Sequence, residues 1–155
     1  MSPLIKVCGM TEAENIRNVE LQGVDMIGFI FYPKSPRCLC QMPGYLPACA
    51  KRVGVFVNER AEVVASMLND GIIFAAQLHG SEDEDYIGDL RRCTGGILIQ
   101  AFSVASPSDM ERAAASPADY VLLDSGGGTG RTFDWRLIKG FKRPYFLAGG
   151  LGADN

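Results

Sequence analysis

The sequence predicts an α/β fold with a parallel sheet, because two regularities extend over the whole chain. Runs rich in Val, Ile, Leu and Phe recur seven times, and amphipathic or loop stretches separate them. Their spacing averages about 23 residues, which is the length of one strand–helix unit. Several runs, such as 26–31 and 120–123, are continuous in hydrophobicity, as in parallel strands that are covered on both faces. We therefore expect about seven parallel strands.

The individual elements follow from local signals. The expected strands are 4–8, 25–31, 53–57, 73–78, 96–101, 119–124 and 144–148. Thr11 and Glu14 have the spacing of a capping box, and Gly23 is a stop signal, so a first helix is expected between them. Further helices are expected at 62–68, 82–92 and 108–115. The segment 41–49 contains two prolines and a glycine, so any helix there should be short or irregular.

The alternation fits either a doubly wound sheet or a (β/α) barrel. A doubly wound nucleotide-binding domain carries a Gly-rich fingerprint after its first strand, whereas residues 8–11 read Cys-Gly-Met-Thr. Nearly every expected strand ends in a functional-looking group, which is typical of the TIM (β/α)8 barrel, where catalysis is built at that end. Eight units need roughly 185 residues. We therefore expect residues 1–155 to form a single, incomplete barrel domain that lacks the eighth strand–helix unit.

Composition narrows the classes of partner. Of the 155 residues, 47% are hydrophobic, and the net charge is −3 with no basic run, so nucleic acid is not an expected partner. No apolar run approaches the ~20 residues that span a bilayer, and no signal peptide is evident. Five cysteines, an odd number, indicate reduced thiols and a cytoplasmic location. A single histidine argues against a metal site.

Two strand ends carry candidate catalytic groups. Cys8 lies just before the first expected helix, and a helix N-terminus stabilises a thiolate, the reactive form of cysteine. Asp124 ends a very apolar run, where partial desolvation favours a protonated carboxyl that can act as a general acid. From the residues alone, Cys8 could equally pack as a small hydrophobe, and Asp124 could fix the following turn.

Other strand ends carry candidate binding groups. Arg37 lies on a loop with two prolines, where it could clamp a carboxylate or phosphate or simply be solvated. His79 could order the site, touch a substrate or have a structural role. The Gly-rich segment 125–132, which includes Gly128, either brings its backbone close to a ligand or is a plain connector. Gly149 and Gly150 could bind phosphate through their N–H groups or form an ordinary turn.

Taken together, the motifs resemble those of the phosphoribosylanthranilate isomerase family of tryptophan biosynthesis. The resemblance covers the whole chain and is specific in the order of its short motifs, each near a strand end. The matching segments are 6–11, 32–37, 52–58, 77–80, 123–124, 127–130, 133–135 and 147–151.

The resemblance implies an Amadori rearrangement of a small phosphosugar, without cofactor or metal. Asp124 would protonate the furanose ring oxygen and open the ring to a Schiff base, and the Cys8 thiolate would remove the proton from sugar C2. Arg37 would bind the anthranilate carboxylate. His79, Gly128, Gly149 and Gly150 would be substrate-binding residues, the last two through the phosphate.

The expected missing unit raises an alternative from another class. The chain could be an inactive barrel fragment that acts as a non-catalytic, anion-binding or partner-pairing module. We expect a monomer or a homodimer, with pairing possible through the open edges of the first and last strands.

Overall fold

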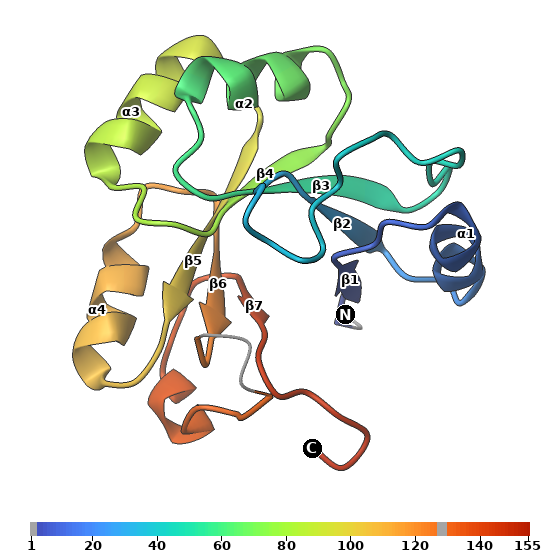
Figure 1. Ribbon diagram of the computed structural model, residues 1–155. Helices are drawn as coiled ribbons and strands as arrows, with labels where there is room; N and C mark the ends of the chain where they lie inside the picture. The colour runs from blue at the N-terminus through green and yellow to red at the C-terminus, as the bar shows by residue number, and fades with distance from the viewer. Residues whose placement is uncertain (1–2, 127–129) are drawn as a thin grey trace. The chain divides into compact units, whose positions relative to one another are not determined.

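The computed structural model describes residues 3–126 and 130–155. Its internal contacts divide the chain into two compact units, 1–97 and 98–155, and each is described by itself. Among the described residues there are seven strands, four α-helices and one 3-10 helix, and Figure 1 labels the strands and the α-helices. All seven expected strands are confirmed, with ends that differ from the expectation by up to two residues.

The first unit contains four parallel strands and three helices. The elements are β1 (Lys6–Cys8), α1 (Ala13–Leu21), β2 (Met26–Ile30), β3 (Lys51–Phe56), α2 (Ala61–Asn69), β4 (Ala75–Leu78) and α3 (Glu84–Cys93). The strands pair in the order in which they occur in the chain. The segment 41–49 forms no helix.

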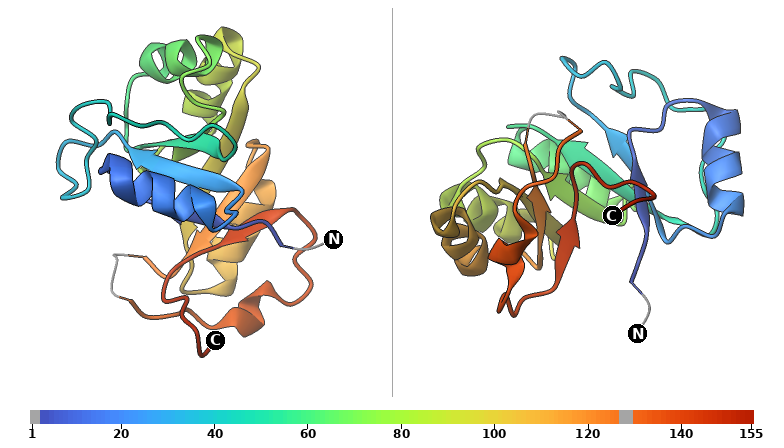
Figure 2. Two further views of the ribbon diagram at one scale, coloured as in Figure 1. Left: turned by 90° about the vertical axis from the view of Figure 1, so that its right-hand side faces the viewer. Right: turned by 90° about the horizontal axis from the view of Figure 1, so that it is seen from below.

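The core of this unit places α1 against the sheet. Ile16 of α1 is fully buried in a cluster with Ile27 and Phe29 of β2, and Leu39 and Ala50 complete it. In Figure 2, left, α1 runs alongside β2. This packing stabilises α1 through one apolar face, because a nine-residue helix is marginal by itself.

The expected capping box of α1 is wrong. The helix begins after Glu12, which has extended backbone and makes no side-chain cap hydrogen bond. The carboxylate of Glu12 instead accepts a hydrogen bond from the Asn15 amide, 3.0 Å away. A capping box does form at α4, where the side chains of Ser106 and Asp109 cap each other's backbone N–H groups.

The second unit contains three parallel strands, again in chain order. Its elements are β5 (Ile97–Ser103), α4 (Pro107–Ala115), β6 (Tyr120–Asp124), the 3-10 helix η1 (Trp135–Ile138) and β7 (Tyr145–Leu147). A core of Phe102, Val104, Met110, Val121 and Leu123 joins α4 to β5 and β6. The strand order within each unit follows the sequence, as in a barrel; a doubly wound sheet reverses its strand order at the switch point.

Arg143 connects the end of α4 to the segment before β7. Its guanidinium donates hydrogen bonds to the carbonyl oxygens of Ala113, Ala114, Ser116 and Ala118, at distances between 2.5 and 3.3 Å. The last carbonyls of a helix have no partner within the helix, and a cation is favourable there. Arg143 therefore satisfies the C-terminal end of α4 from 25 to 30 residues further along the chain.

Candidate active site

Cys8 is the last residue of β1 and lies opposite Gly28 of β2 in the strand register. The thiol is free and partly exposed. A Cβ added to Gly28 would lie 2.6 Å from the Cys8 Sγ, so the missing side chain of Gly28 provides the space that the thiol occupies. A glycine inside an apolar strand is the sequence signal of such an approach.

Arg37 lies over the turn that follows Cys8. Gly9 has a φ of +85°, and a Cβ there would be 2.9 Å from Arg37 Cδ and 3.0 Å from Nη1. Ser35 holds the loop, because its hydroxyl accepts a hydrogen bond from the Arg37 N–H at 3.2 Å. Within the first unit, the chain thus brings an exposed guanidinium next to the end of β1.

The ends of β3 and β4 are joined by the carboxylate of Glu82. This buried side chain accepts hydrogen bonds from the Asn58 N–H at 2.6 Å and the Gly80 N–H at 2.7 Å. Asn58 has a φ of 52°, and its side-chain oxygen accepts from the Ser81 N–H at 2.8 Å. Glu82 was expected to begin a helix, but α3 begins at Glu84, with Asp83 as its N-cap.

His79 directly follows β4 and is exposed. Its backbone N–H donates a hydrogen bond to the carbonyl oxygen of Phe56 at 2.8 Å, which fixes the backbone beside the end of β3. Its ring Nδ1 lies 2.7 Å from the side-chain Nε2 of Gln77. The two side chains are two residues apart, and side chains at that spacing in a strand point to the same face.

Asp124 is the last residue of β6 and is partly exposed. Its carbonyl oxygen accepts a hydrogen bond from the Val104 N–H at 2.8 Å, which fixes the end of β6 beside β5. Its carboxylate accepts a long hydrogen bond from the Ser125 hydroxyl at 3.4 Å.

The two glycines after β7 belong to this end of the second unit. Gly149 has a φ of +83°, and a Cβ there would lie 2.4 Å from the Asp124 Oδ1. Gly150 has a φ of +67°, and a Cβ there would lie 2.5 Å from the backbone of Arg131. Gly149 is therefore needed for the approach of this loop to the Asp124 carboxylate. Gly128, also expected to bind substrate, lies outside the described residues.

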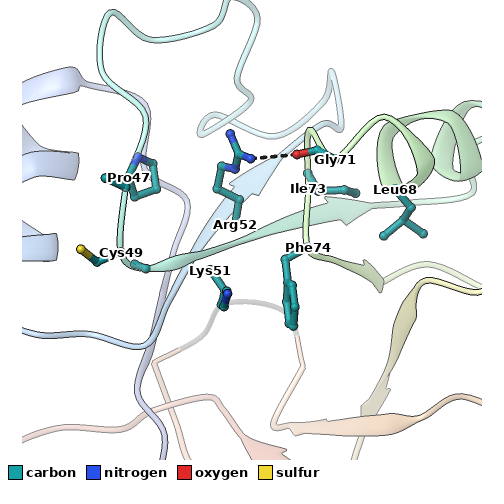
Figure 3. Close-up of a pocket in the computed structure, with 10 residues that line it drawn as sticks. Pro47, Cys49, Lys51, Arg52, Leu68, Gly71, Ile73 and Phe74 are labelled. Carbon is teal, nitrogen blue, oxygen red and sulfur yellow. Dashed lines mark hydrogen bonds between the residues drawn. The ribbon is translucent and has the colours of Figure 1, made fainter.

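A hollow of about 380 Å³ in the first unit lies at the amino-terminal ends of β3 and β4 (Figure 3). Lys51 and Arg52 at the start of β3, together with Ile73 and Phe74 before β4, contribute to its lining. Arg52 donates a hydrogen bond to the carbonyl oxygen of Gly71 at 2.8 Å. Because Cys8, Asn58 and His79 lie at the carboxyl ends of their strands, this hollow is not the candidate active site.

The described residues contain no group of three or more His, Cys, Asp and Glu side chains arranged to hold a metal ion. Within the same residues, none of the helices combines the length and the apolar character that crossing a membrane requires.

Comparisons with known proteins find the family that the motifs resemble. Residues 5–155 match the family described as N-(5'phosphoribosyl)anthranilate (PRA) isomerase. A relative of that name from Phocaeicola vulgatus is 40% identical, over 96% of this chain and 76% of its own length. The relative from Endomicrobium trichonymphae is 36% identical, over 99% of this chain and 80% of its own.

Solved structures extend the agreement to three dimensions. The crystal structure of phosphoribosyl anthranilate isomerase from Thermotoga maritima is 34% identical, covers 99% of this chain and 80% of that chain, and has a TM-score of 0.84. Another isomerase structure, 33% identical with a TM-score of 0.82, covers 99% of this chain and 79% of that chain, and holds reduced 1-(o-carboxyphenylamino)-1-deoxyribulose 5-phosphate. The fold is thus of the TIM-barrel type that the strand pattern predicted. With motifs, fold and relatives in agreement, the chain belongs to the N-(5'-phosphoribosyl)anthranilate isomerase family.

Proposed function

We propose that this chain isomerises N-(5'-phosphoribosyl)anthranilate to 1-(2-carboxyphenylamino)-1-deoxyribulose 5-phosphate, with Asp124 as general acid and Cys8 as general base. The observation that carries the proposal is the match to this isomerase family over residues 5–155, which includes both residues. The two groups suit the two proton transfers, because a carboxylic acid can protonate the ring oxygen and a thiolate can accept a proton from carbon.

The remaining roles are those that the resemblance to the family implies, and the charge and position of the residues support them. Arg37, beside the turn after Cys8, would pair with the anthranilate carboxylate, since a guanidinium binds a carboxylate through two parallel hydrogen bonds. His79, Gly128, Gly149 and Gly150 would bind the substrate, with the phosphate on backbone N–H groups of the last two. The close approach of Gly149 to Asp124 supports the assignment of that loop to the same end of the second unit.

The experiment is turnover of phosphoribosylanthranilate by the wild-type chain and by the Cys8→Ser and Asp124→Asn variants. Loss of a positioned acid or base should lower kcat by about 10²- to 10⁴-fold, with the fold retained by circular dichroism. Cys49→Ser is the matched control, because Cys49 is an exposed free thiol before the start of β3. Normal turnover in both site variants would refute the assigned roles. The match to named isomerases disfavours the alternative of a non-catalytic module.

We further propose a cytoplasmic enzyme that is a monomer or a homodimer. The isomerase of Thermotoga maritima is described as dimeric and has been solved as monomers; that chain is 33% identical to this one with a TM-score of 0.78. All five cysteines are free thiols, as a reducing compartment favours. Sedimentation velocity over a range of concentrations distinguishes the two assembly states, and a larger defined assembly would contradict the proposal.

A further inference from the structure

The side-chain amide of Gln77 is buried next to the ring of His79. Gln77 is the third residue of β4 and is only 2% exposed. Its Nε2 lies 2.7 Å from Nδ1 of His79, whereas its Oε1 is buried and has no hydrogen-bond partner among the described residues. The amide therefore makes one contact toward the candidate site and leaves its acceptor unused.

The chemistry of this contact fixes the state of the ring. An amide nitrogen can only donate, so the Nδ1 of His79 must accept. A neutral imidazole that accepts at Nδ1 carries its proton on Nε2. Rotating the amide by 180° would let Oε1 accept from a protonated Nδ1, but it would bury the amide nitrogen without an acceptor. Buried N–H groups without partners are rarer in proteins than buried oxygens with unused lone pairs.

The unpaired Oε1 of Gln77 indicates that this residue positions His79 and does not serve the stability of the fold. A buried polar atom without a partner costs free energy that an apolar side chain of similar shape would not cost, and the exposed ring of His79 can bind water once the amide is gone. Glutamine at this position is therefore not favoured by the packing of β4. Its one hydrogen bond is to the ring of His79, which is exposed at the end of the strand.

We infer that Gln77 is a positioning residue that orients the ring of His79 for the substrate and holds it as the Nε2–H tautomer. The role of His79 in substrate binding rests on the function proposed above. The tautomer itself does not, and it is measured without substrate.

The single histidine of the chain makes the measurement unambiguous. In tag-free protein labelled with ¹⁵N, long-range ¹H–¹⁵N correlations report which ring nitrogen carries the proton. At a pH where the ring is neutral, we expect the wild type to show Nε2–H alone. Gln77→Met should show a mixture of both tautomers. Gln77→Glu should move the proton to Nδ1, because a carboxylate accepts where the amide donated.

Stability and turnover complete the test. Gln77→Met should unfold at the same or a higher denaturant concentration than the wild type, and its KM for phosphoribosylanthranilate should rise about tenfold, the value of one hydrogen bond. His79→Ala should give a similar rise in KM, and the double variant should add little to either. Gln22→Met, at an exposed glutamine directly after α1, is the control for the substitution and should leave the His79 spectrum unchanged.

The outcomes are distinguishable. A wild-type Nδ1–H tautomer, or a spectrum that Gln77→Met does not alter, overturns the inference whatever the turnover. A large loss of stability in Gln77→Met also overturns it, because the residue would then be structural. If the wild type shows the expected tautomer but no turnover, the proposed function fails while the positioning of the ring stands.

Discussion

The Cys8 thiol occupies the space that a side chain at Gly28 would fill. A Cβ built on Gly28 would lie 2.6 Å from Sγ and 3.1 Å from the Cys8 Cβ. Neither atom belongs to the end of a long flexible side chain, so the strain of a substitution would fall on β1 itself.

The Gly28→Ala variant should therefore lose turnover out of proportion to its loss of stability. We expect destabilisation of about 1–3 kcal/mol from overpacking, and a fall in kcat of about 10²-fold because a displaced base loses its alignment. Denaturant unfolding and steady-state kinetics measure the two effects. Gly54→Ala is the control, because its added Cβ would crowd Phe56 and Ile73 and not Cys8. Equal turnover in the two variants would show that the position of Cys8 is not critical.

The Gly149→Ala variant should lose stability and activity together. Its φ of +83° is unfavourable for alanine, and its Cβ would lie 2.4 Å from the Asp124 Oδ1. We expect a cost of about 1–3 kcal/mol and a lower kcat, because the loop or the carboxylate must move. Gly152→Ala is the matched control, since nothing lies within 4 Å of its added Cβ. Indistinguishable unfolding curves and rates for the two variants would contradict the close approach.

Glu82 and Glu20 offer a matched pair of carboxylates at opposite ends of β3. Glu82 accepts from Asn58 and Gly80 after β3 and β4, and Glu20 accepts from the Cys49 N–H at 2.6 Å and the Ala50 N–H at 2.9 Å before β3. Changing Glu82 to glutamine removes the acceptor of one backbone N–H, because each of its oxygens accepts from one. In Glu20→Gln the remaining oxygen can keep both N–H groups, and the acceptor of the Tyr45 hydroxyl is lost.

We expect Glu82→Gln and Glu20→Gln both to lower the free energy of unfolding, by about 1–3 kcal/mol for the buried Glu82 and by less for Glu20. Only Glu82→Gln should also raise KM, because the two loops that Glu82 joins follow the carboxyl ends of β3 and β4, where the candidate site lies. Urea unfolding and steady-state kinetics on the same preparations test this difference. A rise in KM of the same size in Glu20→Gln would show that the effect is general loosening of the sheet.

Tyr86 gives a prediction for alkaline pH. Burial, followed by the negative charges of Glu82, Glu59 and Glu62, raises the pKa of Tyr86 from 10.0 to about 12. A raised pKa in the folded state means that the folded protein keeps this proton when the unfolded chain has lost it. The contribution to stability is therefore complete below pH 10 and is lost as the pH rises to about 12.

Tyr86→Phe should flatten the fall in unfolding free energy between pH 10 and 12, as measured by urea unfolding at a series of pH values. Tyr120→Phe is the control, because Tyr120 is an exposed tyrosine at the start of β6. A wild-type slope that survives in Tyr86→Phe would refute the shift.

The sequence predicted the strands well because continuous apolar runs are a local signal. The sequence did not predict the role of Glu82, because that role depends on distant residues and not on a local pattern. Its partners at Asn58 and Gly80 are set by the fold, and Asn58 is 24 residues away. A glutamate before a helix pattern is therefore indistinguishable from an ordinary helix start. Gln77 and His79 stood at the correct spacing to share a face, but periodicity does not reveal that the amide is buried and the ring is exposed. The roles of Cys8 and Asp124 came from the resemblance, since each residue alone also fitted a structural role.

The four hydrogen bonds of Arg143 have a consequence for the order of assembly. The carbonyl oxygens at the end of α4 depend on a side chain that is translated 25 to 30 residues later. Until the segment before β7 has been made and has folded back, water must satisfy the last carbonyl oxygens of α4. The end of α4 and the segment before β7 are therefore linked through one side chain, although more than two dozen residues separate them.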